Sequence, residues 1–500
     1  MASVLAAMDE GDPGVLHNEG LRYLNAGRFV EAANLLGRAV ELAPGNAAAH
    51  LDLGIALSSI GRFPLALAAF DRAISIAPTD ALAYSNKSNL LSLLRRYDEA
   101  LAAADRAIAL DRSMPSAHNN RGNALLNLGR LEEAILSTDL AIALDSHYAD
   151  AHYNRGVLLA AFGRIDEAVD SYNEALALDP PMSRARWNRG VCELLQGNYA
   201  RGLDDYEHRA SRTKVLQQRP QLTPLWTGAQ PLAGKTLMVV SELYLGDTIH
   251  FCRYLPILAS QGARVVFSAP NPLRRLLSSL GPTVEVVQQD ELASRFDYGA
   301  VLMSLPRLVE TRLETIPART PYLHPEPHLV ERWRQQLGTH GFKVGVAWRG
   351  SADHGDNERS FDPGLLSSLS RVPGVRLISL QKDGAGDIAA AQASGMAVES
   401  LGDFDSGGHA FIDTAAVMQN LDLIISCDTA IAHLAGALAR PIWVALKRVP
   451  DWRWLLEGDT NPWYPTMRVF RQQRIGDWSV PFDQMRRQLV AEVAGHREDR

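Results

Sequence analysis

The stretch AHYNRGVLLAAFGRIDEAVDSYNEALALDP, residues 151–180, carries a pattern that recurs every 34 residues through the N-terminal part of the chain. It contains Gly156 and Gly163, followed by Ala168 and Ala175. The same residue types recur at Gly20, Gly54, Gly122 and Gly190 (with Ser88 interrupting this series), at Gly27, Gly61, Gly129 and Gly197, at Ala32, Ala66, Ala100 and Ala134, and at Ala39, Ala73, Ala107 and Ala141, while Pro44, Pro78 and Pro180 close three of the units. A fixed period of this length predicts a repeat architecture.

Each repeat is predicted to be a pair of antiparallel helices. Small residues let two helices cross closely, glycine permits the turn between them, and proline ends the second helix. One such hairpin cannot bury its apolar face alone, so the hairpins are expected to stack into a superhelix with a concave groove. A sixth unit, from about Met182, begins with Trp187-Asn-Arg-Gly190 but has Gly202 at the alanine position, which is typical of a cap or junction.

Polar side chains recur at repeat spacing on the first helices, at Asn86, Asn120, Asn154 and Asn188. Their amides can hydrogen-bond the backbone of an extended peptide, so we expect the groove to bind a protein partner. The alternative is that they satisfy neighbouring loops or helix ends.

After a proline-bearing connector at 219–231, short β-branched runs alternate with helical stretches. This alternation predicts parallel, doubly wound sheets, and we expect an α + α/β chain whose second half forms two Rossmann-like domains across a cleft. The predicted strands are Thr236–Ser241, Ala263–Ser268, Val284–Val287, Lys343–Trp348, Arg376–Leu380, Leu421–Ser426 and Pro441–Leu446. Ligands of such sheets bind beyond the carboxyl ends of the strands.

The length of 500 residues exceeds what one hydrophobic core accommodates, which agrees with several domains. The predicted boundaries are an N-terminal tail at 1–12, a repeat array with capping helices at 13–212, a linker at 213–232, Rossmann-like domains at 233–327 and 328–480, and a C-terminal helix and tail at 481–500.

The composition excludes several classes of protein. Lys and Arg number 50 against 57 Asp and Glu, and this net charge of −7 argues against a general nucleic-acid binder. Cys192, Cys252 and Cys427 lie far apart, so neither a disulfide framework nor a cysteine metal site is expected. The N-terminus lacks the basic region of a signal peptide, and no apolar run approaches about 18 residues. We expect a cytoplasmic protein without membrane insertion.

The first strand-to-helix turn, Leu245-Gly246-Asp247-Thr248, carries a candidate general base, Asp247. An aspartate at a helix start is alternatively an N-cap. His250 is a second candidate in this helix, although a lone histidine is more often a packing residue.

The turn Ser426-Cys-Asp428-Thr429-Ala430 opens a second helix, which contains His433. Small residues at a helix start leave N–H groups and the positive end of the dipole open to an anion such as a diphosphate. His433, one turn in, can contact a phosphate or ribose oxygen.

Three cations stand at strand ends or in the polar loop 349–360, namely Arg349, Arg359 and Lys382. Together they can surround a leaving phosphate, which matters in the absence of a metal. Each is alternatively a solvated surface charge.

Two further motifs are interpreted as chance matches. Gly384-Ala-Gly386-Asp387 loosely fits a dinucleotide fingerprint, but it does not open the first βαβ unit and it would place a carboxylate beside the pyrophosphate. Asp403-Phe404-Asp405 imitates the metal-binding DxD of some sugar transferases but lies in a glycine-rich loop. We expect no metal and no dinucleotide cofactor.

With these residues laid out, the chain resembles a bacterial arrangement of tetratricopeptide repeats followed by a GT-B glycosyltransferase, similar to the heptosyltransferase and protein O-GlcNAc transferase groups. The resemblance covers Trp187–Arg209 and nearly all of 230–480. Its most specific stretches are Gly246-Asp-Thr, Phe251-Cys-Arg-Tyr-Leu-Pro256, Ser379-Leu-Gln-Lys382, Phe411-Ile-Asp-Thr-Ala415, Asp422-Leu-Ile-Ile-Ser426, Asp428-Thr-Ala-Ile-Ala-His-Leu-Ala-Gly436 and Val449-Pro-Asp-Trp-Arg-Trp454. Members of this arrangement include flagellin glycosyltransferases, whose repeats hold the flagellin, and some of them use a CMP-activated nonulosonic acid.

The resemblance implies that Asp247 lies where heptosyltransferases place their proposed catalytic base. It likewise puts Asp428, Thr429 and His433 in the donor-nucleotide site, and Arg359 falls near a phosphate-binding cation of that group. The chain departs from the pattern at Ser241–Leu245, where relatives usually carry Gln-Gly before the leucine, and at Lys447-Arg448, which replaces apolar residues. Candidate acceptor-side residues are Tyr244, which would crowd that side, Thr248 and His250.

The resulting hypothesis is an inverting, metal-independent transferase. It would move a sugar from a nucleotide-sugar to a Ser or Thr hydroxyl of a protein held by the repeats, flagellin being the example that the resemblance offers. Two alternatives stay open: a non-catalytic scaffold with a degenerate transferase domain, and a transferase directed at a glycan.

Overall fold

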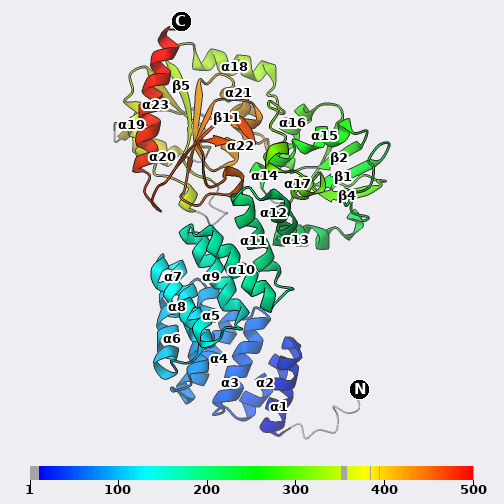
Figure 1. Cartoon of the computed structure of the whole chain (residues 1–500), viewed down its shortest axis with the longest axis vertical. Helices are drawn as coiled ribbons and strands as arrows, with labels where there is room; N and C mark the ends of the chain where they lie inside the picture. Colours follow the sequence, from blue (N-terminus) through cyan, green and yellow to red (C-terminus); the bar gives the residue numbers. More distant parts are fainter. Residues whose placement is uncertain (1–10, 243, 351–356, 383, 394, 499–500) are drawn as a thin grey trace. The chain divides into compact units, whose positions relative to one another are not determined.

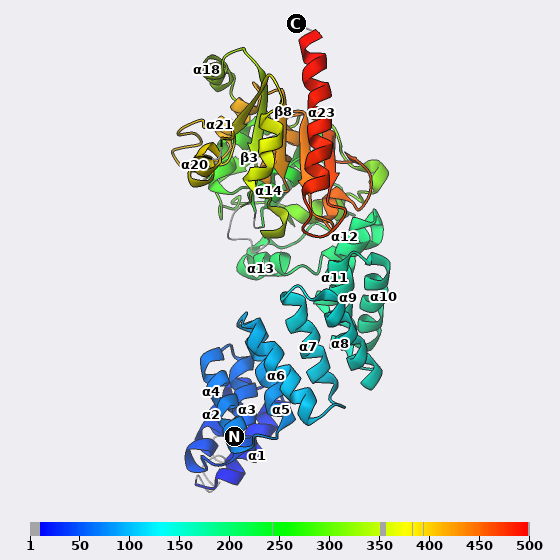
Figure 2. The same ribbon diagram turned by 90° about the vertical axis from the view of Figure 1, so that its left-hand side faces the viewer.

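The computed structural model describes residues 11–242, 244–350, 357–382, 384–393 and 395–498. The chain forms two compact units that divide between Ala185 and Arg186. Antiparallel helix pairs stack side by side in the first unit, which confirms the predicted hairpins (Figure 1 and Figure 2). The pairs are α1 Pro13–Asn25 with α2 Phe29–Leu42, α3 Ala47–Ser59 with α4 Phe63–Ile76, α5 Ala81–Leu93 with α6 Tyr97–Leu110, α7 Pro115–Asn127 with α8 Leu131–Leu144, and α9 Ala149–Phe162 with α10 Ile165–Leu178.

The two glycine series have different structural roles. The second series lies in the turns between paired helices, where Gly61 and Gly163 have φ of +75° and +87°, a conformation that strains other residues. The third repeat has Arg95 at this position, with φ of 59°. The first series lies where paired helices cross, and a Cβ on Gly54 would stand 2.5 Å from the ring of Phe70. Ser88 fits the same position because its hydroxyl donates to the Ala100 carbonyl at 2.7 Å.

The second unit begins with a further helix pair and then two sheets. Its first helices are α11 Ser183–Leu195, which starts at the division between the units, α12 Tyr199–Tyr206 and α13 Ala210–Gln218. The first sheet has the strand order β3-β2-β1-β4 and is parallel throughout. Its strands are β1 Thr236–Val240, β2 Arg264–Ser268, β3 Val284–Val287 and β4 Tyr298–Val301, and its helices include α14 Leu245–Phe251, α15 Tyr254–Ser260, α16 Arg274–Leu277 and α17 Leu305–Leu308.

The second sheet has the order β10-β11-β9-β8-β5-β6-β7, and all its pairs are parallel except β10 with β11. Its strands are β5 Phe342–Ala347, β6 Val375–Ser379, β7 Val398–Glu399, β8 Leu423–Cys427, β9 Ile442–Leu446, β10 Thr460–Asn461 and β11 Tyr464–Arg471. The accompanying helices are α18 Pro327–Leu337, α19 Ser367–Ser370, α20 Ala385–Ala393, α21 Ile412–Met418, α22 Ala430–Ala437 and α23 Ser479–Glu498. The strand order reverses between β5 and β8, as in a doubly wound sheet.

All seven predicted strands are present to within two residues at each end, whereas β4, β7, β10 and β11 were not predicted. The division of the chain also differs from the predicted end of the repeat array at residue 212. The sixth hairpin belongs to the second unit because Tyr199 and Tyr206 of α12 pack edge-on against Trp452, with ring centroids 6.0 and 5.7 Å apart. The Tyr199 hydroxyl also accepts a bond from Trp463 Nε1 at 3.1 Å.

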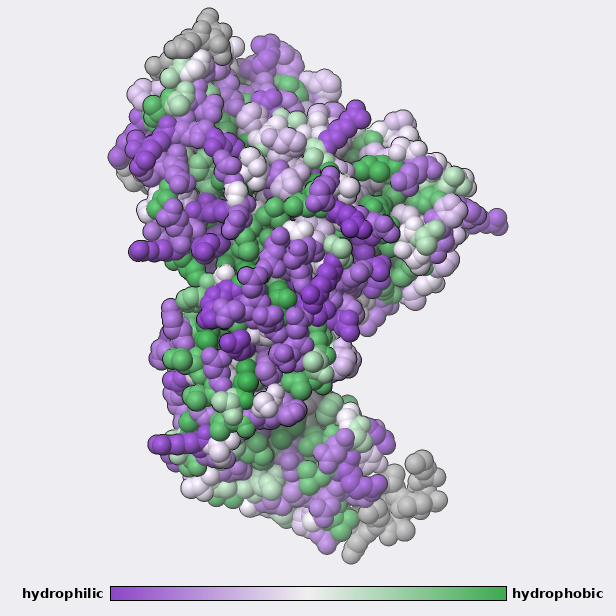
Figure 3. Space-filling view, in the orientation of Figure 1, coloured by the Kyte–Doolittle hydropathy of each residue, from purple (hydrophilic) through white to green (hydrophobic). Residues whose placement is uncertain are grey.

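Hydrophilic residues cover most of the face seen in Figure 3, with apolar residues in patches between them. Within the described residues, none of the helices has the length and apolar character needed to cross a membrane.

The crossing at Gly54 yields a stability prediction. We expect Gly54→Ala to lower the free energy of unfolding by about 1–3 kcal/mol, because the added methyl must displace the Phe70 ring. The measurement is urea or thermal unfolding of the full chain.

Gly37→Ala is the matched control, because a Cβ at this glycine of α2 meets nothing within 4 Å. It should stabilise the chain by up to about 1 kcal/mol through helix propensity. Equal effects of the two substitutions would contradict the close-crossing explanation.

Candidate functional site

A cavity of about 1180 Å³ lies where the strand order of the second sheet reverses. Residues that follow β5, β6 and β8 form one side, and the start of α14 from the first sheet forms the other. The predicted site residues in its lining are Tyr244, Asp247, Arg349, Arg359, Lys382, Asp428, Thr429, Ala430 and His433. Residues 351–356 of the polar loop lie outside the described residues. The cavity therefore occupies the position expected for a ligand of a doubly wound sheet.

The three cations that the sequence analysis singled out all lie in the cavity wall. Lys382 Nζ donates to the Asp405 carbonyl at 2.6 Å, and Arg349 pairs with Asp387 at 3.2 Å. The guanidinium of Arg359 is close enough to Asp428 to oppose the rise of that carboxyl's pKa. Helix α22 also begins here, and no side chain in the described part of the chain caps its start. Cations and free helix amides together provide an environment for an anion.

Asp247 is held by a partner that the sequence did not point to. Its Oδ1 accepts a hydrogen bond of 2.7 Å from Arg453 Nη2, and the side chains are 16% and 7% exposed. Burial raises the pKa of Asp247 above its ordinary value, while the Arg453 charge opposes that rise. Arg453 lies in the turn Trp452–Trp454, and its Nη1 also reaches Asp451 Oδ1 at 3.1 Å. The motif Val449–Trp454 stands out in the sequence, but the sequence does not show which residue of the motif faces the cavity.

Asp428 and His433 both line the cavity, and burial shifts their pKa values in opposite directions. Burial, together with the nearby carboxylate of Asp451, raises the pKa of Asp428 to about 6. Burial and the positive charge of Arg453 hold the pKa of His433 well below its usual range, so this imidazole is neutral. His433 stacks on Trp454 with ring centroids 5.0 Å apart and hydrogen-bonds the Tyr464 hydroxyl at 3.1 Å.

Two of the predicted acceptor-side residues lie outside the cavity lining, and their placement is a correction to the sequence analysis. The Thr248 hydroxyl is buried and donates to the Tyr244 carbonyl of its own helix at 3.1 Å. His250 is fully buried, with Nδ1 hydrogen-bonded to the Tyr464 hydroxyl at 2.8 Å. Both side chains are buried in the packing around α14 and do not reach the cavity wall. Tyr244, 45% exposed, does line the cavity.

The unusual segment before Asp247 has a structural role. Glu242, with a fully buried side chain, receives two bonds of 2.8 Å from the Arg209 guanidinium. Ser211 donates to the same carboxylate at 2.9 Å, and Arg209 also donates to Ser304 at 2.9 Å. The departure at Glu242 therefore fastens the sixth hairpin to the first sheet.

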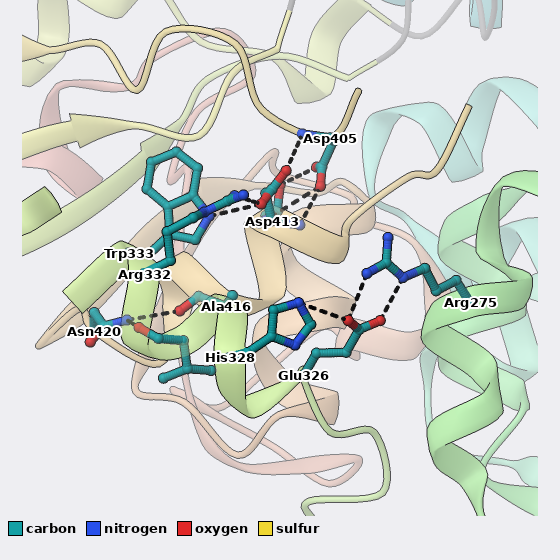
Figure 4. Close-up of polar contacts among 11 residues, drawn as sticks. Arg275, Glu326, His328, Arg332, Trp333, Asp405, Asp413, Ala416 and Asn420 are labelled. Carbon is teal, nitrogen blue, oxygen red and sulfur yellow. Dashed lines mark hydrogen bonds and ion pairs between the residues drawn. The ribbon is translucent and has the colours of Figure 1, made fainter. Parts of the chain in front are cut away.

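The second aspartate of the DxD-like motif, Asp405, is used within the fold. Asp405 Oδ1 accepts from the amides of Asp413 and Thr414 at 2.6 and 3.2 Å, and so caps α21. Asp413 in turn accepts from Trp333 Nε1 of α18 at 2.8 Å and pairs with Arg332 (Figure 4). In the described part of the chain, no group of three or more His, Cys, Asp or Glu side chains is placed to hold a metal.

Figure 4 also shows a contact between the layers of the second unit. Arg275 of α16 donates two bonds of 2.6 Å to Glu326, the residue before α18, and His328 lies 3.5 Å from the same carboxylate. This pair joins the helices of the first sheet to those of the second.

The asparagines predicted to bind peptide also bond within the repeats. Asn120 Nδ2 donates to the Ser85 carbonyl and Asn154 Nδ2 to Asn119 Oδ1, each at 2.9 Å and each across one repeat. Asn86 donates to the Leu82 carbonyl of its own helix at 2.9 Å. These bonds favour the alternative in which such side chains satisfy neighbouring groups, and a peptide contact by them, or by Asn188, stays a prediction.

Comparison with known proteins identifies the repeats. The tetratricopeptide repeat family matches residues 17–81, 89–148, 69–102 and 149–181. The N-terminal region therefore consists of tetratricopeptide repeats.

Protein FlbA of Caulobacter vibrioides is 29% identical over 295 residues, which cover 55% of this chain and 49% of that protein. The chain thus spans about half the length of this curated relative.

Two solved structures are similar to about a third of the chain. TTC0263, a thermophilic TPR protein of Thermus thermophilus, is 22% identical with a TM-score of 0.34, and the match covers 36% of this chain and 99% of that one. YrrB, a TPR protein with an unusual peptide-binding site, is 23% identical with a TM-score of 0.28, over 38% and 99% of the respective chains.

The buried pair at Glu242 yields a second prediction. Glu242→Gln should lower the free energy of unfolding by about 3 kcal/mol, because it leaves the Arg209 charge buried beside a neutral amide. Glu285→Gln is the control, since Glu285 forms an exposed pair with Arg264 and should cost at most about 1 kcal/mol. Urea unfolding of both variants is the measurement, and a similar small effect of both would count against the anchoring role.

A third prediction concerns pH. Asp428 has a pKa of about 6 in the folded chain, above its ordinary value, so its contribution to stability is present in acid and is lost as the pH rises through 6. Asp428→Asn removes that loss, and we expect the variant to gain stability relative to wild type between pH 5 and pH 8. The measurement is the urea midpoint of wild type and variant at both pH values. A difference between the two proteins that is the same at pH 5 and pH 8 would refute the raised pKa of Asp428.

Proposed function

We propose that the chain is a glycosyltransferase of GT-B type that moves a sugar from a nucleotide-sugar donor to a Ser or Thr hydroxyl of a protein. One observation carries this proposal: Asp247 from the first sheet lines the same cavity as Arg359, Lys382 and the start of α22 from the second. Transfer needs a base for the acceptor and an anion site for the leaving group, and this cavity supplies both chemistries.

The donor phosphate would bind on the side of the second sheet. The first amides of α22 and the cations Arg349, Arg359 and Lys382 can neutralise it without a metal. The neutral imidazole of His433 can exchange a hydrogen bond with a phosphate or ribose oxygen. The cavity volume of about 1180 Å³ exceeds the range of roughly 300–1,000 Å³ typical of small-molecule sites, leaving room for an acceptor.

The proposed reaction proceeds with inversion at the anomeric carbon. Asp247 takes the proton of the acceptor hydroxyl, whose oxygen forms a bond to the anomeric carbon. The bond from that carbon to the phosphate oxygen breaks, and its electron pair leaves on the nucleotide. General-base catalysis of this kind contributes about 10²–10⁴-fold to the rate.

The repeats would supply the acceptor. A protein bound in their groove is tethered to the transferase unit, which raises the effective concentration of its hydroxyls. The match to the tetratricopeptide repeat family supports a protein ligand for this part of the chain. Flagellin as the acceptor follows from the family resemblance.

The alternative of a non-catalytic scaffold agrees with the repeats, and the departure from the family pattern at Ser241–Leu245 favours it. The pairing of Glu242 with Arg209 gives this glutamate a structural role that does not require loss of the base. A glycan acceptor is the second alternative, in which the product would be an extended glycan instead of a glycosylated protein.

Two variants test the proposed base and the proposed anion site separately. Asp247→Asn should abolish sugar transfer to protein while leaving nucleotide affinity intact, because the amide cannot accept the proton. Arg359→Gln should weaken nucleotide binding about tenfold or more, the loss of one charge-assisted bond. Titration calorimetry with CMP, CDP, UDP, GDP and ADP, with and without EDTA, measures affinity, and mass spectrometry of protein acceptors measures transfer.

Arg264→Gln serves as the control, since Arg264 is exposed at the start of β2, outside the cavity lining, and is paired with Glu285. Wild type that binds none of these nucleotides would favour the scaffold. Transfer that survives in Asp247→Asn would remove Asp247 as the base.

A further inference from the structure

Arg453 is the most enclosed cation of the cavity. It is 6% exposed, lies in the Trp452–Trp454 turn after β9, and is among the lining residues. Its guanidinium carbon stands 5.0 Å from the centre of the Phe251 ring and 5.2 Å from that of Trp452. Stacking between two aromatic rings, one from each sheet's layer, restricts the plane of the guanidinium.

Two carboxylates bind the terminal nitrogens of the Arg453 guanidinium. Nη2 donates to Asp247 Oδ1 at 2.7 Å, and Nη1 donates to Asp451 Oδ1 at 3.1 Å. Asp451 Oδ1 also accepts from the backbone amide of Arg453 at 3.0 Å, which caps the turn. Within the described residues, Asp247 Oδ2 receives no hydrogen bond, so Arg453 holds one oxygen of the carboxylate and the other has no partner among these residues.

We propose that Arg453 is a positioning residue for Asp247: it holds Oδ1 and turns Oδ2 toward the acceptor hydroxyl. This inference rests on the proposed function, because the role assigned to Asp247 is that of the general base. Arg453 itself neither takes nor gives a proton; the hydroxyl proton passes to Oδ2.

The charge of Arg453 gives the proposal a second consequence. The charged groups that face Asp247 are Arg453 and Arg209, which favour its ionised form, and Asp451 and Glu242, which oppose it. Tyr206 and His433 also lie near Asp247, and His433 is neutral. Loss of the Arg453 charge therefore raises the pKa of Asp247, and since the ionised carboxylate is the base, the acid limb of kcat moves to higher pH.

The test compares Arg453→Met and Arg453→Lys in the full chain. Arg453→Met should lower kcat by about 10²-fold through misplacement of the base. It should also raise the acid limb of the pH profile by about 1–3 pH units through loss of the opposite charge. Arg453→Lys keeps the charge and should restore the limb and part of kcat.

Arg253→Met is the matched control. Arg253 is also buried among aromatic rings, but it bonds to backbone carbonyls and the Tyr322 hydroxyl and does not line the cavity. This control should lower thermal stability without moving the acid limb. An unmoved limb in Arg453→Met, or one that moves equally in Arg253→Met, overturns the proposal.

A readout without turnover separates this inference from the proposed function. Infrared difference spectra of each protein against its Asp247→Asn counterpart report the protonated carboxyl of Asp247 as a function of pH. That signal should persist to higher pH in Arg453→Met than in wild type and in Arg453→Lys. If the signal shifts in Arg453→Met but the chain transfers no sugar, the proposed transferase function is contradicted, while the effect of Arg453 on the pKa of Asp247 is retained. If the signal does not shift, that effect of Arg453 is refuted.

Discussion

The ion pair between Arg453 and Asp247 is the contact on which the candidate site depends. The two residues come from the layers of different sheets, 206 positions apart, and their bond of 2.7 Å joins two residues of the cavity lining. A charge buried in this way is stable only while its partner is present, because an unpaired buried charge costs several kcal/mol. The pair therefore joins α14 to the Trp452–Trp454 turn and fixes the position of the Asp247 carboxylate in the cavity wall.

The sixth hairpin contacts residues next to this pair. Tyr199 and Tyr206 pack against Trp452, and Arg209 binds Glu242 a few residues before Asp247. The last helices of the repeat pattern are thus part of the α/β unit that contains the cavity. No residue of α12 lines the cavity. For the proposed transferase, we nevertheless expect substitutions in α12 to affect the site indirectly, by shifting the Trp452 ring.

Much of the fold and part of the site follow from the sequence. The 34-residue period predicted the helix pairs, and alternating β-branched runs predicted seven strands, because both patterns are local. β11 was missed since Tyr464–Arg471 mixes charged and apolar residues without a clear period. Strand ends predicted nine lining residues, yet Arg453 and Asp451 lie in a turn whose contacts span the two sheets. Thr248 and His250 were misplaced because closeness to Asp247 in the sequence does not decide which side chains reach the cavity: His250 bonds instead to Tyr464, a residue 214 positions away.

The central claim is that the cavity between the two sheets binds the phosphate of a nucleotide-sugar. A crystal structure of the full chain with the tightest-binding nucleotide tests it most directly. The account predicts phosphate oxygens within hydrogen-bond distance of the first amides of α22 and of Arg359, with Asp247 still bound to Arg453. A nucleotide found outside this cavity, or one whose phosphate lies away from α22, would contradict it.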